Sequence, residues 1–157
     1  DDTISGGAGV DTLVYTGGTD SLTGGAGNDV FDIDAVGADV GSIIIADVAD
    51  GDTIALDGIS TNGTIADVTA TNWDAADITG TLGASATLAN YLDAAADGDG
   101  SANAVLEWFQ FGGNTYIVVS NDDGTTGFTA ATDSAIQLTG THDISDSSVT
   151  GEVITIA

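Results

Sequence analysis

Four aspartates recur at nine-residue intervals near the start of the chain: Asp2, Asp11, Asp20 and Asp29. Each is followed two positions later by an apolar residue: Ile4, Leu13, Leu22 and Phe31. Glycines precede two of the aspartates, as Gly6-Gly7-Ala8-Gly9 and Gly24-Gly25-Ala26-Gly27. The repeated unit is therefore Gly-Gly-x-Gly-x-Asp-x-U-x, where U is apolar. Glycine adopts backbone angles closed to other residues, so carbonyl oxygens can turn inward beside the carboxylate. Such oxygens are the ligands of a hard cation such as Ca²⁺, which takes about six to eight of them.

One glycine turn cannot supply that many oxygens, so neighbouring turns must share a cation. If each coil of the chain holds two repeats, equivalent residues of successive coils stack on the same side, about 4.8 Å apart. This register predicts Asp11 and Asp29 on one side and Asp2 and Asp20 on the other. The apolar residues of the repeat then point inward and form a narrow core. We predict these calcium ligands: Gly6, Gly7, Gly9, Asp11, Gly18, Asp20, Gly24, Gly25, Gly27, Asp29, Asp2, Asp47 and Asp52.

Two parts of this ligand set leave alternatives open. The acidic turn Asp47–Asp52 follows the repeats, and it serves equally well as a further calcium site or as a solvated turn. The third repeat is degenerate, because Tyr15 and Thr16 replace its first two glycines while Gly18 and Asp20 are kept. The number of complete calcium sites is therefore open. A metal-free array of glycine turns is the alternative for the repeats as a whole.

Charge is the extreme feature of the composition. The 157 residues include 25 Asp plus Glu and neither Lys nor Arg, which gives a formal net charge of −25. Self-repulsion of this size opposes a compact state unless cations come from outside. Nucleic acid is excluded as a direct partner because its binding requires a basic surface. We expect no membrane insertion, since no apolar run reaches membrane-spanning length. There is no cysteine, so disulfides cannot stabilise the fold.

The predicted fold class is all-β. A short parallel β-roll over residues 1–34 is joined to a mainly antiparallel β-sandwich over residues 35–157, and the two share one core. Beyond the repeats, alternating apolar runs predict strands at 42–46, 53–56, 105–111, 116–120, 135–139 and 153–157. The pair Gly112-Gly113 predicts a hairpin. Apolar residues at helical spacing predict one short helix over residues 85–96, with Gly98 placed to end it.

Residues 2–32 resemble the RTX repeats of proteins exported by bacterial type I systems. The run Ile43–Ile59 resembles the segment that follows such repeats. Residues 105–146 resemble C-terminal regions of secreted and surface-layer RTX proteins. The resemblance implies Ca²⁺ as cofactor, an extracellular or cell-surface location and the type I export machinery as a partner. It also implies an uncleaved C-terminal export signal, which the acidic-then-apolar end Asp146–Ala157 fits.

Catalysis is not expected. His142 is the only histidine, and no nucleophile motif accompanies it. Asp97-Gly98-Asp99-Gly100 fails the ligand spacing of an EF-hand, and Asp122-Asp123-Gly124 is expected to be a plain turn. We predict a structural subunit of an extracellular bacterial assembly, a surface layer or filament. Its copies would associate through calcium and edge strands, with Asp2–Ser5 and Val153–Ala157 as candidate edges. The alternative is the calcium-folding and secretion module of a larger secreted hydrolase or adhesin.

Overall fold

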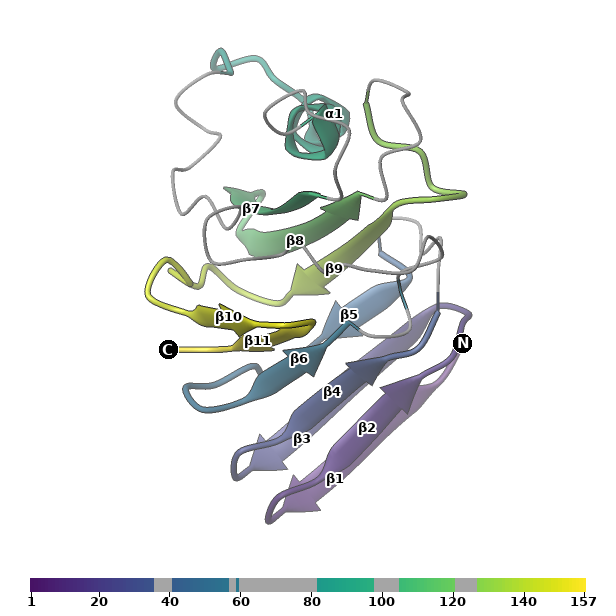
Figure 1. The fold of residues 1–157 in the computed structure, drawn as a ribbon, viewed down its shortest axis with the longest axis vertical. Helices are drawn as coiled ribbons and strands as arrows, with labels where there is room; N and C mark the ends of the chain where they lie inside the picture. The colour runs from purple at the N-terminus through teal and green to yellow at the C-terminus, as the bar shows by residue number, and fades with distance from the viewer. Residues whose placement is uncertain (36–40, 57–58, 60–81, 98–104, 121–126) are drawn as a thin grey trace.

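Two mixed β-sheets and one short helix form the fold in the computed structural model, which describes residues 1–35, 41–56, 59, 82–97, 105–120 and 127–157 (Figure 1). The first sheet has the strand order β1 (Thr3–Ala8), β3 (Asp20–Ala26), β5 (Ile43–Ile45), β9 (Ser134–Leu138), β8 (Asn114–Ser120) and β7 (Val105–Phe111). The second has the order β10 (Ser148–Thr150), β11 (Val153–Thr155), β6 (Thr53–Ala55), β4 (Val30–Ile33) and β2 (Thr12–Tyr15). The predicted class, mostly β with one short helix, is therefore correct.

The chain alternates between the two sheets along its first 55 residues, and we call strands β1 to β6 the parallel coils. Strands β1, β3 and β5 pair in parallel in one sheet, and β2, β4 and β6 do so in the other. Thr3 pairs with Ser21 and Thr12 with Val30, so equivalent residues stack one coil apart. This confirms the register predicted from two repeats per coil. Both parallel ladders continue beyond residue 34 without a break.

Both sheets contribute to one buried core. The apolar residues of the repeats point into it: Leu13, Leu22 and Phe31 are buried, and Ile4 packs against their cluster. Their spacing puts them on the inner face of each strand because side chains alternate across a strand. Beyond the repeats, Ile43, Ile45, Ile54, Ile136 and Ile154 belong to the same cluster. Burial of one such side chain contributes about 1.5–3 kcal/mol, so this core is the main cohesive contribution in a chain without Lys or Arg.

The antiparallel part of the first sheet begins at β9, which pairs in parallel with β5 and antiparallel with β8. The predicted hairpin joins β7 to β8, with Phe111 opposite Asn114. Its two-residue loop has φ of 62° at Gly112 and 88° at Gly113. Positive φ at both central residues is the condition for the tight turn that matches strand twist. This short loop explains why β8 begins two residues before the predicted strand.

The helix α1 (Leu88–Asp97) packs on the opposite face of β7 and β8 from the main core. Its buried residues Leu92 and Ala95 join Phe109 and Tyr116 in a second cluster. It begins later than the predicted residue 85 because Thr87 caps it. The Thr87 Oγ1 accepts the N–H of Asn90 at 3.4 Å, and the Asn90 Oδ1 accepts the N–H of Thr87 at 3.0 Å. No helix in the described ranges is long and apolar enough to cross a membrane.

The last strand corrects one prediction. Val153–Ala157 was expected to be a free strand that could add to a neighbour's sheet. Instead β11 lies between β10 and β6 and pairs with both. Ile154 and Ile156 are buried in the main core, so deleting this segment would remove an inner strand. The sequence pattern had not predicted β10, the short strand that pairs with β11 at the edge of the sheet.

The acidic turns at 98–100 and 122–124 lie outside the described residues.

Candidate metal centre

Asp11 and Asp29 stack on one side of the parallel coils, as predicted. The Asp29 Oδ1 accepts the backbone N–H of Asp11 at 2.9 Å. The other carboxylate oxygen of each, Oδ2, is buried and has no hydrogen-bond partner. Asp29 as a whole is only 1% exposed. A buried carboxylate oxygen without a partner is costly unless a cation or a donor satisfies it.

Glycines pack closely against these carboxylates. A Cβ built on Gly6 would lie 2.7 Å from the Asp11 Oδ2 and 2.8 Å from the carbonyl oxygen of Gly24. Gly24, at the same repeat position one coil later, faces the Asp29 Oδ2 in the same way. Glycine at Gly6 therefore lets oxygens of two successive turns lie close together, and we call this cluster of oxygens the cradle.

The donor set of this cradle fits Ca²⁺, which prefers carboxylate and carbonyl oxygens. Asp11, Asp29 and the Gly24 carbonyl are the groups that would hold the ion. Within the described residues, no three Asp, Glu or His side chains gather into a metal-binding group. The carbonyl oxygen of Gly24 lies 2.8 Å from a Cβ built on Gly6, so backbone oxygens of the glycine turns would add to the coordination. A bound cation would neutralise the carboxylates and join neighbouring coils.

The predicted ligands Asp47 and Asp52 close the third coil on the same side. The Asp47 Oδ1 and Oδ2 accept the N–H groups of Gly24 and Gly25 at 2.8 and 2.9 Å. The Asp52 Oδ1 accepts the N–H of Asp29 at 2.8 Å, and its Oδ2 accepts that of Ala49. All four oxygens thus cap backbone donors. Their role as calcium ligands stays a prediction.

A carboxylate ladder that the sequence had not predicted links successive coils. Asp20 accepts the N–H of Asp2, Asp29 that of Asp11, and Asp52 that of Asp29. The eighteen-residue spacing of the first two contacts was available in the sequence. The third was hidden because the separation becomes 23 residues after the repeats end.

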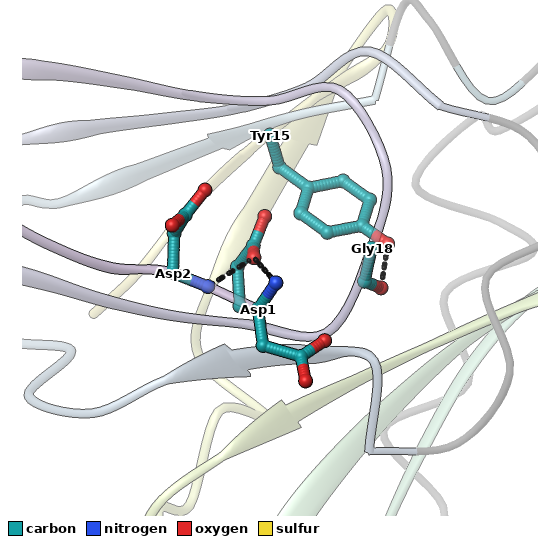
Figure 2. A network of polar contacts seen from close by, with 5 residues as sticks. Asp1, Asp2, Tyr15 and Gly18 are labelled. Carbon is teal, nitrogen blue, oxygen red and sulfur yellow. Dashed lines mark hydrogen bonds and ion pairs between the residues drawn. The ribbon is translucent and has the colours of Figure 1, made fainter.

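The predicted ligands Asp2, Gly18 and Asp20 lie on the other side of the coils, in a different arrangement. The Asp20 Oδ1 accepts the N–H of Asp2 at 2.8 Å and lies 3.9 Å from the terminal ammonium of Asp1 (Figure 2). The Tyr15 hydroxyl donates to the Gly18 carbonyl at 2.9 Å. Burial raises the pKa of the Tyr15 phenol, and the negative charge of Asp20 raises it further.

Paired substitutions test the side-by-side placement of Asp11 and Asp29. Because they share a contact and a cradle, Asp11→Asn and Asp29→Asn should be non-additive by about 0.5–3 kcal/mol in free energy of unfolding at saturating calcium. The matched cycle combines Asp11→Asn with Asp20→Asn, which lie on opposite sides of the coils. Their effects on the free energy of unfolding should be additive within about 0.5 kcal/mol. Urea denaturation of the six proteins, wild type included, measures both couplings. Equal couplings in the two cycles would show that the assigned sides are wrong.

Comparison with protein families agrees with this geometry. The model for the RTX calcium-binding nonapeptide repeat (4 copies) matches residues 1–22 and 14–32. A comparison with curated proteins gave no match. The matched stretch contains the glycine turns and aspartates of the first two coils. Residues 1–32 are thus RTX calcium-binding nonapeptide repeats, and Ca²⁺ is the cofactor that they bind.

Proposed function

We propose that the protein is a non-enzymatic, calcium-dependent structural subunit of an extracellular bacterial assembly, such as a surface layer or filament. RTX repeats are typical of secreted proteins, which supports an extracellular location. The parallel coils form a β-roll in this proposal, and the antiparallel strands close one end of it. The observation that carries the proposal is the pair of sheet edges at the opposite end.

Strands β1 and β2 are the outer strands of their respective sheets, and both lie at the same end of the molecule (Figure 1). Each has its partner one coil further in, in a parallel register. One incoming coil could therefore pair with both edges at once. Unpaired edges seek strands of the same hydrogen-bonding pattern. A second copy presenting a strand in each sheet would extend the fold rather than cover it.

Electrostatics would make such association depend on calcium. A chain with net charge −25 repels its own copies at low salt. Calcium ions bound at the glycine turns would lower that charge next to the edges.

The contacts of the one histidine suit a structural role for this residue. The Nε2 of His142 lies 2.9 Å from the Thr139 carbonyl oxygen, and its backbone N–H donates to the Thr115 Oγ1 at 2.8 Å.

Assembly is tested by light scattering and negative-stain microscopy across a calcium titration. We expect ordered assemblies at millimolar calcium and monomers in chelator; contact of the β1–β2 edges with a different face of the next copy gives open-ended arrays, and contact with that copy's own β1–β2 edges gives closed dimers. Val14→Lys places a charge on edge strand β2, where Val14 is 44% exposed, and should raise the calcium needed for assembly or abolish it. Val153→Lys is the matched control, since Val153 is 37% exposed but sits in the inner strand β11. If the two variants assemble alike, the β1–β2 edges are not the contact.

The second candidate function is the calcium-folding and type I secretion module of a larger secreted hydrolase or adhesin. The edges at β1 and β2 favour it as well, because further repeats of the same polypeptide could stack there. The mass of the native polypeptide distinguishes the two. A mass near that of the 157 residues, 15.4 kDa, supports the subunit, and a far larger mass supports the module. A chain that stays monomeric at millimolar calcium also favours the module.

A further inference from the structure

The two sides of the parallel coils, where the turns lie, differ at one position of the repeat. Gly6, Tyr15 and Gly24 each stand five residues before a repeat aspartate. At Gly6 and Gly24, the place where a Cβ would stand is crowded by the Oδ2 of the following aspartate. At Tyr15 that place holds a Cβ and a phenol ring, and the residue is 2% exposed. The carboxylate of Asp20 therefore cannot take the position that Asp11 and Asp29 take.

The contacts of the aspartates reflect this difference. In the described part of the chain, the buried carboxylate oxygens without a partner belong to Asp11 and Asp29, and Asp20 contributes none. The nearest atom to a Cβ built on Gly18 is the Asp20 Oδ1, at 3.5 Å. The Asp20 carboxylate thus lies toward Gly18 rather than toward position 15.

The Tyr15 hydroxyl also uses a group that a cation would need. It donates to the Gly18 carbonyl at 2.9 Å, across the turn that leads to Asp20 (Figure 2). A carbonyl oxygen turned toward a neutral donor satisfies the turn without an ion. The ring fills part of the core, so it cannot leave without opening a cavity.

We propose that the first repeats bind calcium on one side of the coils only, between the turns that end in Asp11 and Asp29. On the other side, Tyr15 closes the Asp20 turn in place of a cation. This inference rests on calcium binding by the repeats and not on assembly. It assigns to Tyr15 a metal-independent role, which is to hold the turn before Asp20 through its hydrogen bond to the Gly18 carbonyl. Calcium then binds only on the opposite side, at the turns that end in Asp11 and Asp29.

Isosteric variants of the two aspartates give the direct test. Isothermal titration calorimetry counts bound calcium and gives affinities for the wild type, Asp29→Asn and Asp20→Asn. We expect Asp29→Asn to lose a site or weaken it at least about tenfold, because it removes a ligand charge. Asp20→Asn should leave stoichiometry and affinities unchanged, since an amide oxygen can still accept the N–H of Asp2. Equal losses in the two variants would overturn the one-sided arrangement. A wild type that binds no calcium would instead contradict the calcium role itself.

Restoring the repeat gives a second, independent test. Tyr15→Gly with Thr16→Gly recreates the two missing glycines and should add one calcium site, which Asp20→Asn in the same background should remove. Tyr15→Phe is the matched control, because it deletes the hydroxyl and keeps the ring, and it should add none. Circular dichroism at saturating calcium establishes that each variant folds. A folded double-glycine variant with unchanged stoichiometry would contradict closure by Tyr15. If that variant does not fold, the comparison of Asp20→Asn with Asp29→Asn decides.

Discussion

Removal of calcium with excess chelator is expected to unfold the parallel coils, with loss of most of the β-sheet signal in far-ultraviolet circular dichroism. Ions that bind only the folded state add their binding free energy to stability, about 2.7 kcal/mol per site at a hundred times the Kd. Without them, the buried Oδ2 atoms of Asp11 and Asp29 have no partner. The strands β5 and β6 share the core with the rest of the chain, so the loss should spread beyond the repeats.

The control separates ion binding from general screening. Sodium chloride at 1 M shortens the screening length to about 3 Å and weakens repulsion between surface charges, but it supplies no ligand-specific cation. We expect it to restore only part of the signal, and calcium to restore all of it. An unchanged spectrum and melting temperature in chelator would contradict calcium-coupled folding. Full recovery in sodium chloride alone would assign the effect to net charge.

Gly25→Ala is expected to destabilise the protein far more than Gly7→Ala, although the two glycines hold the same repeat position and both have φ of 104°. The positive φ costs a side chain about 1–2 kcal/mol in either case. A methyl group on Gly7 meets nothing within 4 Å, whereas one on Gly25 collides with the backbone carbonyl of Gly7. Overpacking against a backbone that cannot move adds about 1–3 kcal/mol.

Urea denaturation at saturating calcium measures this difference, and Gly9→Ala with Gly27→Ala repeats the comparison. Gly9 has nothing within 4 Å of its built Cβ, and Gly27 faces the carbonyl of Gly9. The outer turn should tolerate alanine and the inner turn should not. If Gly25→Ala and Gly7→Ala cost the same, the two turns do not stack as described.

The sequence was sufficient to predict the features that its period dictates. A nine-residue repeat with two turns per coil leaves only one register, and the pairing of Thr12 with Val30 follows from it. The hairpin at Gly112-Gly113 was predictable because positive φ at two successive residues almost requires glycine. The cradle at Asp11 and Asp29 was predictable for the same reason as the register.

Other features had no local signal. Asp47 contacts the turn at Gly24 and Gly25 because β5 pairs with β3 in the first sheet, and the nine-residue period is lost before β5. The closure by Tyr15 was visible as a departure from the repeat, but its contact with Gly18 depends on the ring being drawn into the core. The inner position of β11 could not be inferred from an apolar terminal run, because an edge strand and an inner strand of three residues have similar sequences.

The way the sheets are completed has a consequence for folding kinetics. The first two coils pair across eighteen residues, as Thr12 with Val30, and the third pairs across twenty-three, as Asp20 with Ile43, but Ile43 pairs with Ile136, and Ile54 with Ile154. Folding slows as the sequence separation of contacts grows, because a long loop must be closed before its contacts are gained. The coils and the hairpin of β7 with β8 should therefore form early, and docking of β9 and β11 should be the slow step. Until those strands arrive, β5 and β6 are temporary sheet edges, and the chain is then most exposed to mispairing with a second copy.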